Sequence, residues 1–237
     1  MLFDLRGRGR RRTVQTIYLM LALLLGGGLV LFGIGSDTGS GGLVDAIQGD
    51  GSGGSATDQV DKRIEQQLAK TKADPKDEQA WAELAIARFQ RANIDGITQQ
   101  GTYTDGGKKR LGLATAAWER HLALEPKTPN DRAATLMVQA YGPNGLNELD
   151  KAVRAKQIVT AAQDPPTSNQ FVQLAQLAYQ AGDSRVGDLA ADRAVELAPK
   201  DERKELRTAL ETLKSTAAGQ AAQQAAQDAQ GAAGGGQ

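Results

Sequence analysis

The sequence of 237 residues predicts an all-α fold, namely one N-terminal transmembrane helix, a flexible linker, and an α-solenoid of helix pairs closed by a capping helix. Three observations predict this architecture. An uncharged and largely apolar run occupies residues 14–34. Further along, a pattern of large and small residues that ends in proline recurs at helical spacing. Apolar residues return at helical spacing in residues 201–214, which suits a capping helix with one face in water.

The first predicted element is a membrane helix at residues 14–35, which follows a basic segment at residues 1–13. A bilayer is crossed by about 20 apolar residues, and positive charge before such a helix stays in the cytoplasm. We therefore expect a single-pass protein with a cytoplasmic N-terminus, an extracytoplasmic C-terminal domain, and the lipid bilayer as one partner. The arginines before the run are Arg6, Arg8, Arg10, Arg11 and Arg12.

A cleaved secretory signal is the competing interpretation of this segment. The apolar run is longer than the core of a typical signal, and residues 33–37 lack an Ala-x-Ala cleavage site. The chain also contains no cysteine to which a lipid could be attached. These features favour a signal-anchor that is retained, and cleavage remains the alternative.

Low-complexity segments flank the predicted helical domain, which we place at residues 57–214. Residues 36–56 are rich in Gly and Ser and predict a flexible tether. Residues 215–237 are almost entirely Ala, Gln and Gly, which predicts a brief extension of the last helix followed by disorder.

The helical domain contains a repeated pattern that is clearest in residues 171–199. There Phe171, Leu174 and Ala175 begin one helix, and a second helix ends before a proline. The same pattern begins at Trp81 and ends at Pro126, with an insertion at about residues 94–110. A weaker middle repeat occupies residues 133–159 and has no aromatic residue at the first position. One such unit cannot bury its apolar face alone, so about three must stack.

This spacing resembles the tetratricopeptide repeat (TPR) family, whose units of about 34 residues form helix-turn-helix pairs. The resemblance implies a scaffold that binds other proteins or peptide segments through a concave surface lined by the first helix of each pair. Its candidate groove residues are Gln79, Ala82, Ile86, Phe89, Val138, Tyr141, Asn169, Val172, Gln176 and Tyr179.

Two interpretations of the groove aromatics stay open. Tyrosine and phenylalanine suit peptide binding because they supply a large, stiff contact area, yet they also suit packing between helices. The insertion at residues 94–110 is a further candidate contact site, since long loops often carry function. TPR proteins that grip a C-terminal carboxylate place Lys and Asn in the groove, and here apolar residues such as Ala82 and Val172 take those places.

Composition argues against catalysis, and we predict neither an enzyme nor a cofactor or metal site. The one histidine, His121, has no second His or Cys with which to form a metal site. The sequence of residues 106–110 lacks the spacing of a phosphate-binding loop and predicts a solvated loop. A single basic cluster is not a nucleic-acid interface, so we expect no nucleic-acid partner.

The whole architecture resembles the ancillary chaperone subunit of the bacterial Sec translocon, which combines a basic N-terminus, one membrane helix and an extracytoplasmic TPR domain. The resemblance implies a chaperone-like protein of the bacterial inner membrane that binds exported polypeptides or an envelope complex, with the translocon as a further partner. Residues 74–81 are also similar to TPR domains of cytochrome c maturation factors. An assembly factor for one envelope or cytochrome c maturation complex is therefore the alternative.

Overall fold

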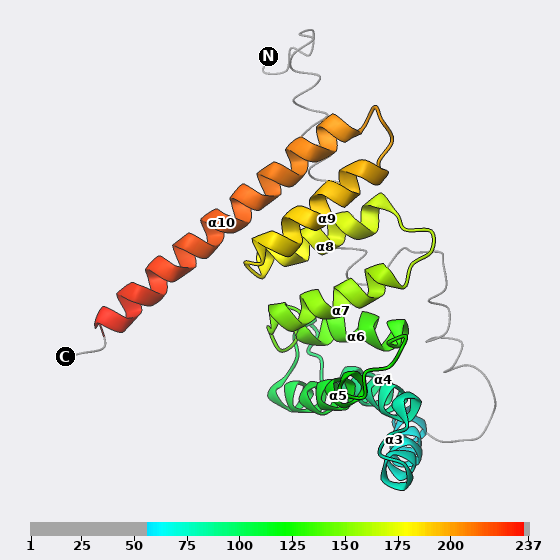
Figure 1. The fold of residues 1–237 in the computed structure, drawn as a ribbon. Coiled ribbons are helices and arrows are strands. Elements are labelled where there is room, and N and C mark those ends of the chain that lie inside the picture. The colour runs from blue at the N-terminus through cyan, green and yellow to red at the C-terminus, as the bar shows by residue number, and fades with distance from the viewer. Residues whose placement is uncertain (1–55, 235–237) are drawn as a thin grey trace, which may run out of the picture. The chain divides into compact units, whose positions relative to one another are not determined.

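The computed structural model describes residues 56–234, whose regular secondary structure is entirely α-helical and belongs to one compact unit (Figure 1). The predicted all-α class is confirmed for this part of the chain. In chain order the helices are α3 (Ala56–Ala73), α4 (Glu78–Asp95), α5 (Asp105–Ala123), α6 (Asp131–Tyr141), α7 (Leu149–Ala161), α8 (Ser168–Gln180), α9 (Ser184–Leu197) and α10 (Arg203–Gly234).

The predicted membrane helix at residues 14–35 and nearly all of the predicted linker lie outside the described residues. Among the helices of residues 56–234, none has both the length and the apolar character needed to cross a bilayer. The transmembrane segment therefore stays a prediction.

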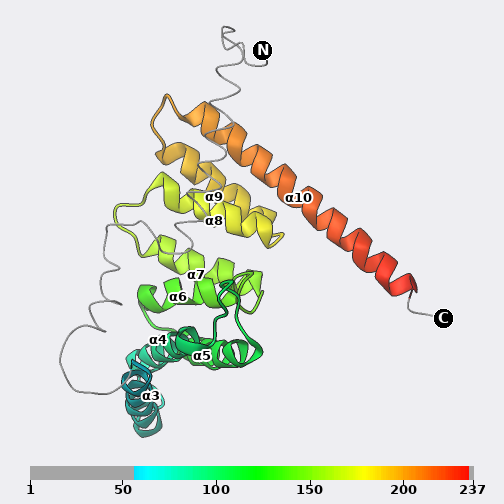
Figure 2. The same ribbon diagram turned by 180° about the vertical axis from the view of Figure 1, so that it is seen from behind.

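Consecutive helices pack as antiparallel pairs. Helix α4 packs on α5, α6 on α7, and α8 on α9, while α3 packs on the outer side of the first pair against α4. Contacts of α7 with α8, and of α10 with both α8 and α9, continue the stack. Seen from either side, α8 and α9 lie next to each other and α10 extends beyond them (Figure 2). Each helix thus covers an apolar face that its neighbour would otherwise expose to water.

Short polar side chains begin several of these helices. The carboxylate of Asp77, the amide oxygen of Asn130 and the carboxylate of Asp183 each accept a backbone N–H from the first turn, at 2.9, 2.8 and 3.0 Å. A cap of this kind contributes about 1 kcal/mol because it satisfies a donor that the helix itself leaves free. The starts of α4, α6 and α9 are therefore determined locally.

The buried apolar residues form two clusters rather than one. The first cluster is built on α4, α5 and α6 and includes one face of α7 through Ala152 and Ala155. The second is built on α8, α9 and the first part of α10, and it takes in Val153 of the same helix. Helix α7 therefore separates two apolar cores, and its contact with α8 is the junction between them.

Two segments are more helical than the sequence predicts. Helix α5 begins at Asp105, so the irregular part of the insertion is confined to residues 96–104. Helix α10 continues to Gly234, through most of the tail for which the sequence predicts disorder. Alanine and glutamine have high helix propensity, which favours extension beyond Ala217, the last residue that packs on the second cluster.

Candidate interaction surface

His121 is a structural residue of α5, with 3% of its surface exposed and both ring nitrogens engaged. Its Nδ1 donates to the carbonyl oxygen of Glu78 at 2.9 Å, so Nε2 carries the lone pair that accepts the N–H of Asn130 at 3.2 Å. The ring also stacks on Trp118, with the centroids 5.2 Å apart. His121 therefore joins α4, α5 and the start of α6.

The segment of residues 106–110, which contains three basic residues, lies in the first turns of α5 rather than in a loop. Lys108 and Lys109 are exposed, while Arg110 pairs with Asp95 of α4. Among the described side chains of residues 56–227, no group of three His, Cys, Asp or Glu gathers where a metal ion could be held.

The ten predicted groove residues divide by exposure. Two at helix starts, Gln79 and Asn169, are exposed, and three more, Val138, Val172 and Gln176, are partly exposed. The remaining five are buried: Ala82, Ile86, Phe89, Tyr141 and Tyr179. The first four of these belong to the first apolar cluster and Tyr179 to the second, so neighbouring helices cover them.

The side chain of Tyr141 lies between helices α5 and α7. Its hydroxyl donates to Glu119 at 3.2 Å, and the Nζ of Lys151 reaches the same carboxylate at 2.7 Å while lying 5.5 Å from the centre of the tyrosine ring. The hydrogen bond from Lys151 lowers the pKa of Glu119, and burial raises the pKa of Tyr141. Tyr141 therefore serves the packing between helices, as in the alternative that the sequence leaves open.

The side chain of Tyr179 makes the equivalent contacts in the next pair. Its ring packs on α9 at Gly187, and its hydroxyl donates to Asp188 at 2.9 Å. The other oxygen of that carboxylate meets the Nζ of Lys214 at 2.7 Å. Lys214 and then Tyr179 lower the pKa of Asp188, while burial raises the pKa of the tyrosine. These contacts tie α10 to α8 and α9.

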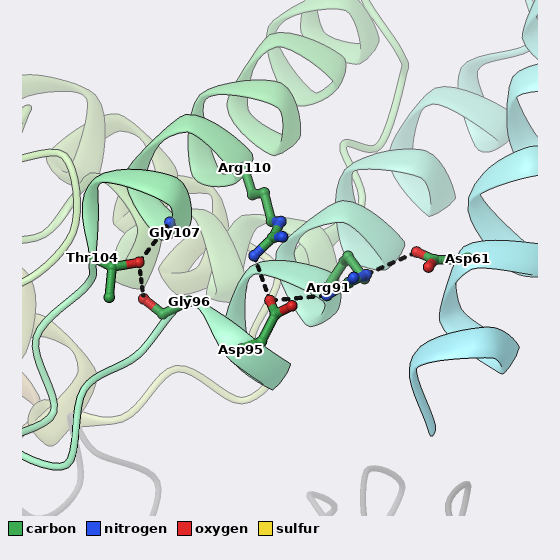
Figure 3. Close-up of polar contacts among 7 residues, drawn as sticks. All are labelled: Asp61, Arg91, Asp95, Gly96, Thr104, Gly107 and Arg110. Carbon is green, nitrogen blue, oxygen red and sulfur yellow. Dashed lines mark hydrogen bonds and ion pairs between the residues drawn. The ribbon is translucent and has the colours of Figure 1, made fainter. Parts of the chain in front are cut away.

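The insertion between α4 and α5 is an ordered hairpin. Ile97 and Tyr103 form an antiparallel bridge, and the N–H of Thr98 donates to the carbonyl of Thr102 at 2.8 Å. Thr104 closes the hairpin, because its hydroxyl donates to the Gly96 carbonyl at 3.3 Å and accepts the N–H of Gly107 at 3.0 Å (Figure 3). Ile97 is exposed on this hairpin, so the insertion stays a second candidate contact surface.

A chain of charges joins α3 to the two helices that flank this hairpin (Figure 3). Arg91 of α4 pairs with Asp61 of α3 at 2.8 Å and with Asp95 at 2.9 Å. Asp95 in turn pairs with Arg110 of α5, and its hydrogen bond with Arg91 lowers its pKa. Because the two carboxylates are nearly half exposed, at 48% for Asp61 and 47% for Asp95, the network orients α3, α4 and α5 more than it stabilises them.

Because of Tyr103, we expect the hairpin to lose stability at alkaline pH. Its hydroxyl donates to Asn93, and burial raises its pKa to about 12, above the value of about 10 in an unfolded chain. A raised pKa in the folded state means that stability is complete below pH 10 and is lost as pH rises towards 12. We expect the urea midpoint to fall over this range, and to fall less in Tyr103→Phe, as followed by circular dichroism. Parallel curves for both proteins would contradict this.

Three predicted groove residues lie on one accessible side of α8 together with Gln173, which the prediction did not include. We call this set the α8 face: Asn169, Val172, Gln173 and Gln176. These residues follow the i, i+3, i+4, i+7 spacing that puts side chains on one side of a helix. Three of them carry amides and one is apolar, and α8 has no charged residue along its whole length. Such a face can hydrogen-bond to a polypeptide backbone without selecting a charge by itself.

Lys156 of α7 lies at the edge of the α8 face. Its Nζ donates to Oε1 of Gln173 at 2.6 Å. Burial lowers the pKa of Lys156, and no carboxylate among the described side chains of residues 56–227 pairs with it. One turn further along α7, the buried hydroxyl of Thr160 has no hydrogen-bond partner within the described part of the chain. Polar groups thus occupy the junction between the two apolar clusters.

Lys156, Thr160 and Gln173 are absent from the candidate residues chosen from the sequence. The sequence does contain a signal for Lys156, which falls in the middle repeat at helical spacing with Ala152, Val153 and Val159. A lysine in that series breaks an otherwise apolar stripe. Only the packing of α7 on α8 shows that the break faces another helix rather than water.

Comparison of the chain with family models, curated proteins and solved structures finds no match. The fold and surface define the class directly, as an all-helical protein of stacked antiparallel helix pairs.

Proposed function

We propose that this protein is a TPR-like interaction scaffold that binds polypeptide segments through the α8 face. Residues 57–214 supply the stack of helix pairs, with α10 as the closing helix, and residues 14–35 supply a membrane anchor. The binding domain lies outside the cytoplasm in this proposal, beside the Sec translocon, where it acts as a chaperone for exported chains. An assembly factor that binds one envelope or cytochrome c maturation partner is the alternative.

The observation that carries the proposal is the composition and exposure of the α8 face. Amides at three positions on one face offer donors and acceptors to a backbone, and Val172 offers a small apolar contact. The aromatic groove residues do not take part, because neighbouring helices cover Phe89, Tyr141 and Tyr179. A surface of amides and one valine is better suited to bind many different sequences weakly than to bind one sequence tightly.

Photo-crosslinking from the α8 face in the living cell tests this function. A photoreactive residue at position 172 or 176 of the full chain is expected to capture polypeptides, which mass spectrometry then identifies. Position 189 of α9 is the matched control, because Leu189 is 62% exposed and lies off the α8 face. A yield at least several times higher from positions 172 and 176 is the expected result.

The identity of the captured chains separates the two versions of the proposal. Many unrelated exported chains together with translocon subunits support the chaperone, and one dominant partner supports the assembly factor. Equal yields from positions 172, 176 and 189 would show that the α8 face has no binding role.

A further inference from the structure

We propose that the polypeptide bound at the α8 face carries a side-chain carboxylate, and that Lys156 is the counter-ion for it. The inference rests on the proposed function and names the chemistry of the partner. In this proposal Lys156 selects acidic polypeptides, because the α8 face beside it carries no charge. The following contacts and charges support it.

The first support is the unbalanced charge of Lys156. An ammonium group has three N–H donors, and the structure gives this one a single partner, the neutral amide of Gln173 at 2.6 Å. Its side chain is largely buried beside α8, where removal from water disfavours the charged form. A buried cation without a counter-ion is costly, and a carboxylate brought by a partner would offset that cost.

The second support is the contrast with the other lysines that join helices in the described residues. Lys151 meets Glu119 and Glu148, each at 2.7 Å, and Lys214 meets Asp188 at 2.7 Å. In both places the chain supplies the carboxylate itself. At Lys156 the neighbouring helix supplies only a neutral amide. The positive charge of Lys156 is therefore not balanced within the described residues, and a carboxylate from a partner could balance it.

The third support is the incomplete hydrogen bonding around Lys156. Thr160 lies one turn away on α7 with 4% of its surface exposed, and its hydroxyl has no partner in the described part of the chain. By comparison, the hydroxyl of Thr135 on α6 donates to the carbonyl four residues earlier, at 2.9 Å. A purely structural polar junction would be expected to satisfy its members. At this junction the Thr160 hydroxyl, which has no hydrogen-bond partner, lies one helical turn from the Lys156 ammonium, which has no counter-ion.

The charge of the surroundings then selects the partner. Because α8 is uncharged over its whole length, an incoming segment meets no second cation and no competing carboxylate on that helix. A segment with one acidic side chain among neutral residues fits this arrangement. A highly basic segment would bring like charge towards Lys156 and is excluded by the same reasoning.

The test uses the full chain in detergent micelles and an array of short random-sequence peptides with acetylated and amidated ends. Each peptide is printed beside a copy in which every Asp and Glu is replaced by Asn or Gln, so that only side-chain carboxylates differ. For pairs that bind, fluorescence anisotropy gives the two dissociation constants. We expect the wild type to bind the acidic member roughly tenfold or more tightly, as for other pairs that lose one buried charge.

Variants of Lys156 connect this preference to one side chain. Lys156→Met is expected to bind both members of a pair equally, at the level of the neutral peptide, while its thermal midpoint is unchanged or higher. Lys156→Gln provides the same comparison if the first variant does not fold. Lys151→Met is the matched control, since that lysine already has carboxylate partners, and it should keep the wild-type preference.

Each outcome decides a different statement. Equal binding of both peptides by the wild type, or a preference that persists in the Lys156 variants, overturns the role of Lys156 while the proposed function stands. If the wild type retains no peptide of either kind, the proposed function itself fails.

Discussion

Gly107→Ala is expected to destabilise the domain by roughly 3 kcal/mol or more, because it forces two backbones apart. A Cβ at position 107 would lie 2.9 Å from the Cα of Gly96 and closer still to the Gly96 carbonyl oxygen. That carbonyl cannot retreat freely, since the N–H and the hydroxyl of Thr104 both donate to it, at 2.9 and 3.3 Å (Figure 3). The substitution therefore separates α4 from α5 at the base of the hairpin.

Gly106→Ala is the matched control for this prediction. Position 106 is exposed, and a Cβ there meets only the hydroxyl oxygen of Thr104, at 3.8 Å. Because alanine is the better helix former, we expect a gain of up to about 1 kcal/mol. Urea unfolding of both variants followed by circular dichroism measures the difference. Similar free energies of unfolding for the two variants would show that the approach of α4 and α5 is not tight.

Trp118→Ala is expected to cost about 3–5 kcal/mol, as for other large side chains removed from a close-packed core. Trp118 is only 2% exposed, belongs to the first apolar cluster and stacks on His121. Its removal leaves a cavity between α5 and its neighbours and frees the imidazole that joins Glu78 to Asn130. The free energy of unfolding therefore falls for two reasons: packing is lost, and the buried, hydrogen-bonded imidazole of His121 is no longer held in place.

Trp81→Ala provides the comparison within the same cluster. Trp81 is only partly buried, and its indole N–H donates to the carbonyl of Pro75 at 3.0 Å in an exposed position. We expect a clearly smaller loss, of about 1–2 kcal/mol. The unfolding free energies should be obtained by circular dichroism, because each variant removes one of the two tryptophans that a fluorescence signal would report. A larger loss of stability for Trp81→Ala than for Trp118→Ala would show that Trp81, and not Trp118, is the more important tryptophan of the core.

The helices themselves could be predicted because their signals are local. The large and small residues of residues 171–199 anticipate α8 and α9, and Asp183 begins α9 as a cap between them. The insertion and the tail were harder to predict, because their Gly, Lys, Ala and Gln residues carry no apolar period. Their structure depends on propensity and on capping by Thr104, which are weaker signals than an amphipathic pattern.

The candidate site could be predicted only in part. Asn169, Val172 and Gln176 are accessible on α8, as a groove position requires, whereas Tyr141 and Tyr179 lie at equivalent positions along their helices and are buried. Neighbouring helices cover both tyrosines, and their hydroxyls donate to Glu119 and Asp188, which come from other helices. Spacing along one helix shows which residues share a face, and it does not show which neighbour covers that face.

The sequence by itself determined the helical class, the order of the helices and their pairing through short turns, since periodicity and caps act over a few residues. The tertiary structure alone decided that Phe89, Tyr141 and Tyr179 are packed inside and that the apolar core is divided at α7. It also decided that Lys156 meets the amide of Gln173 instead of a carboxylate. The physical reason is that burial and charge balance are properties of surfaces in contact, and the partners at each surface are far apart along the chain.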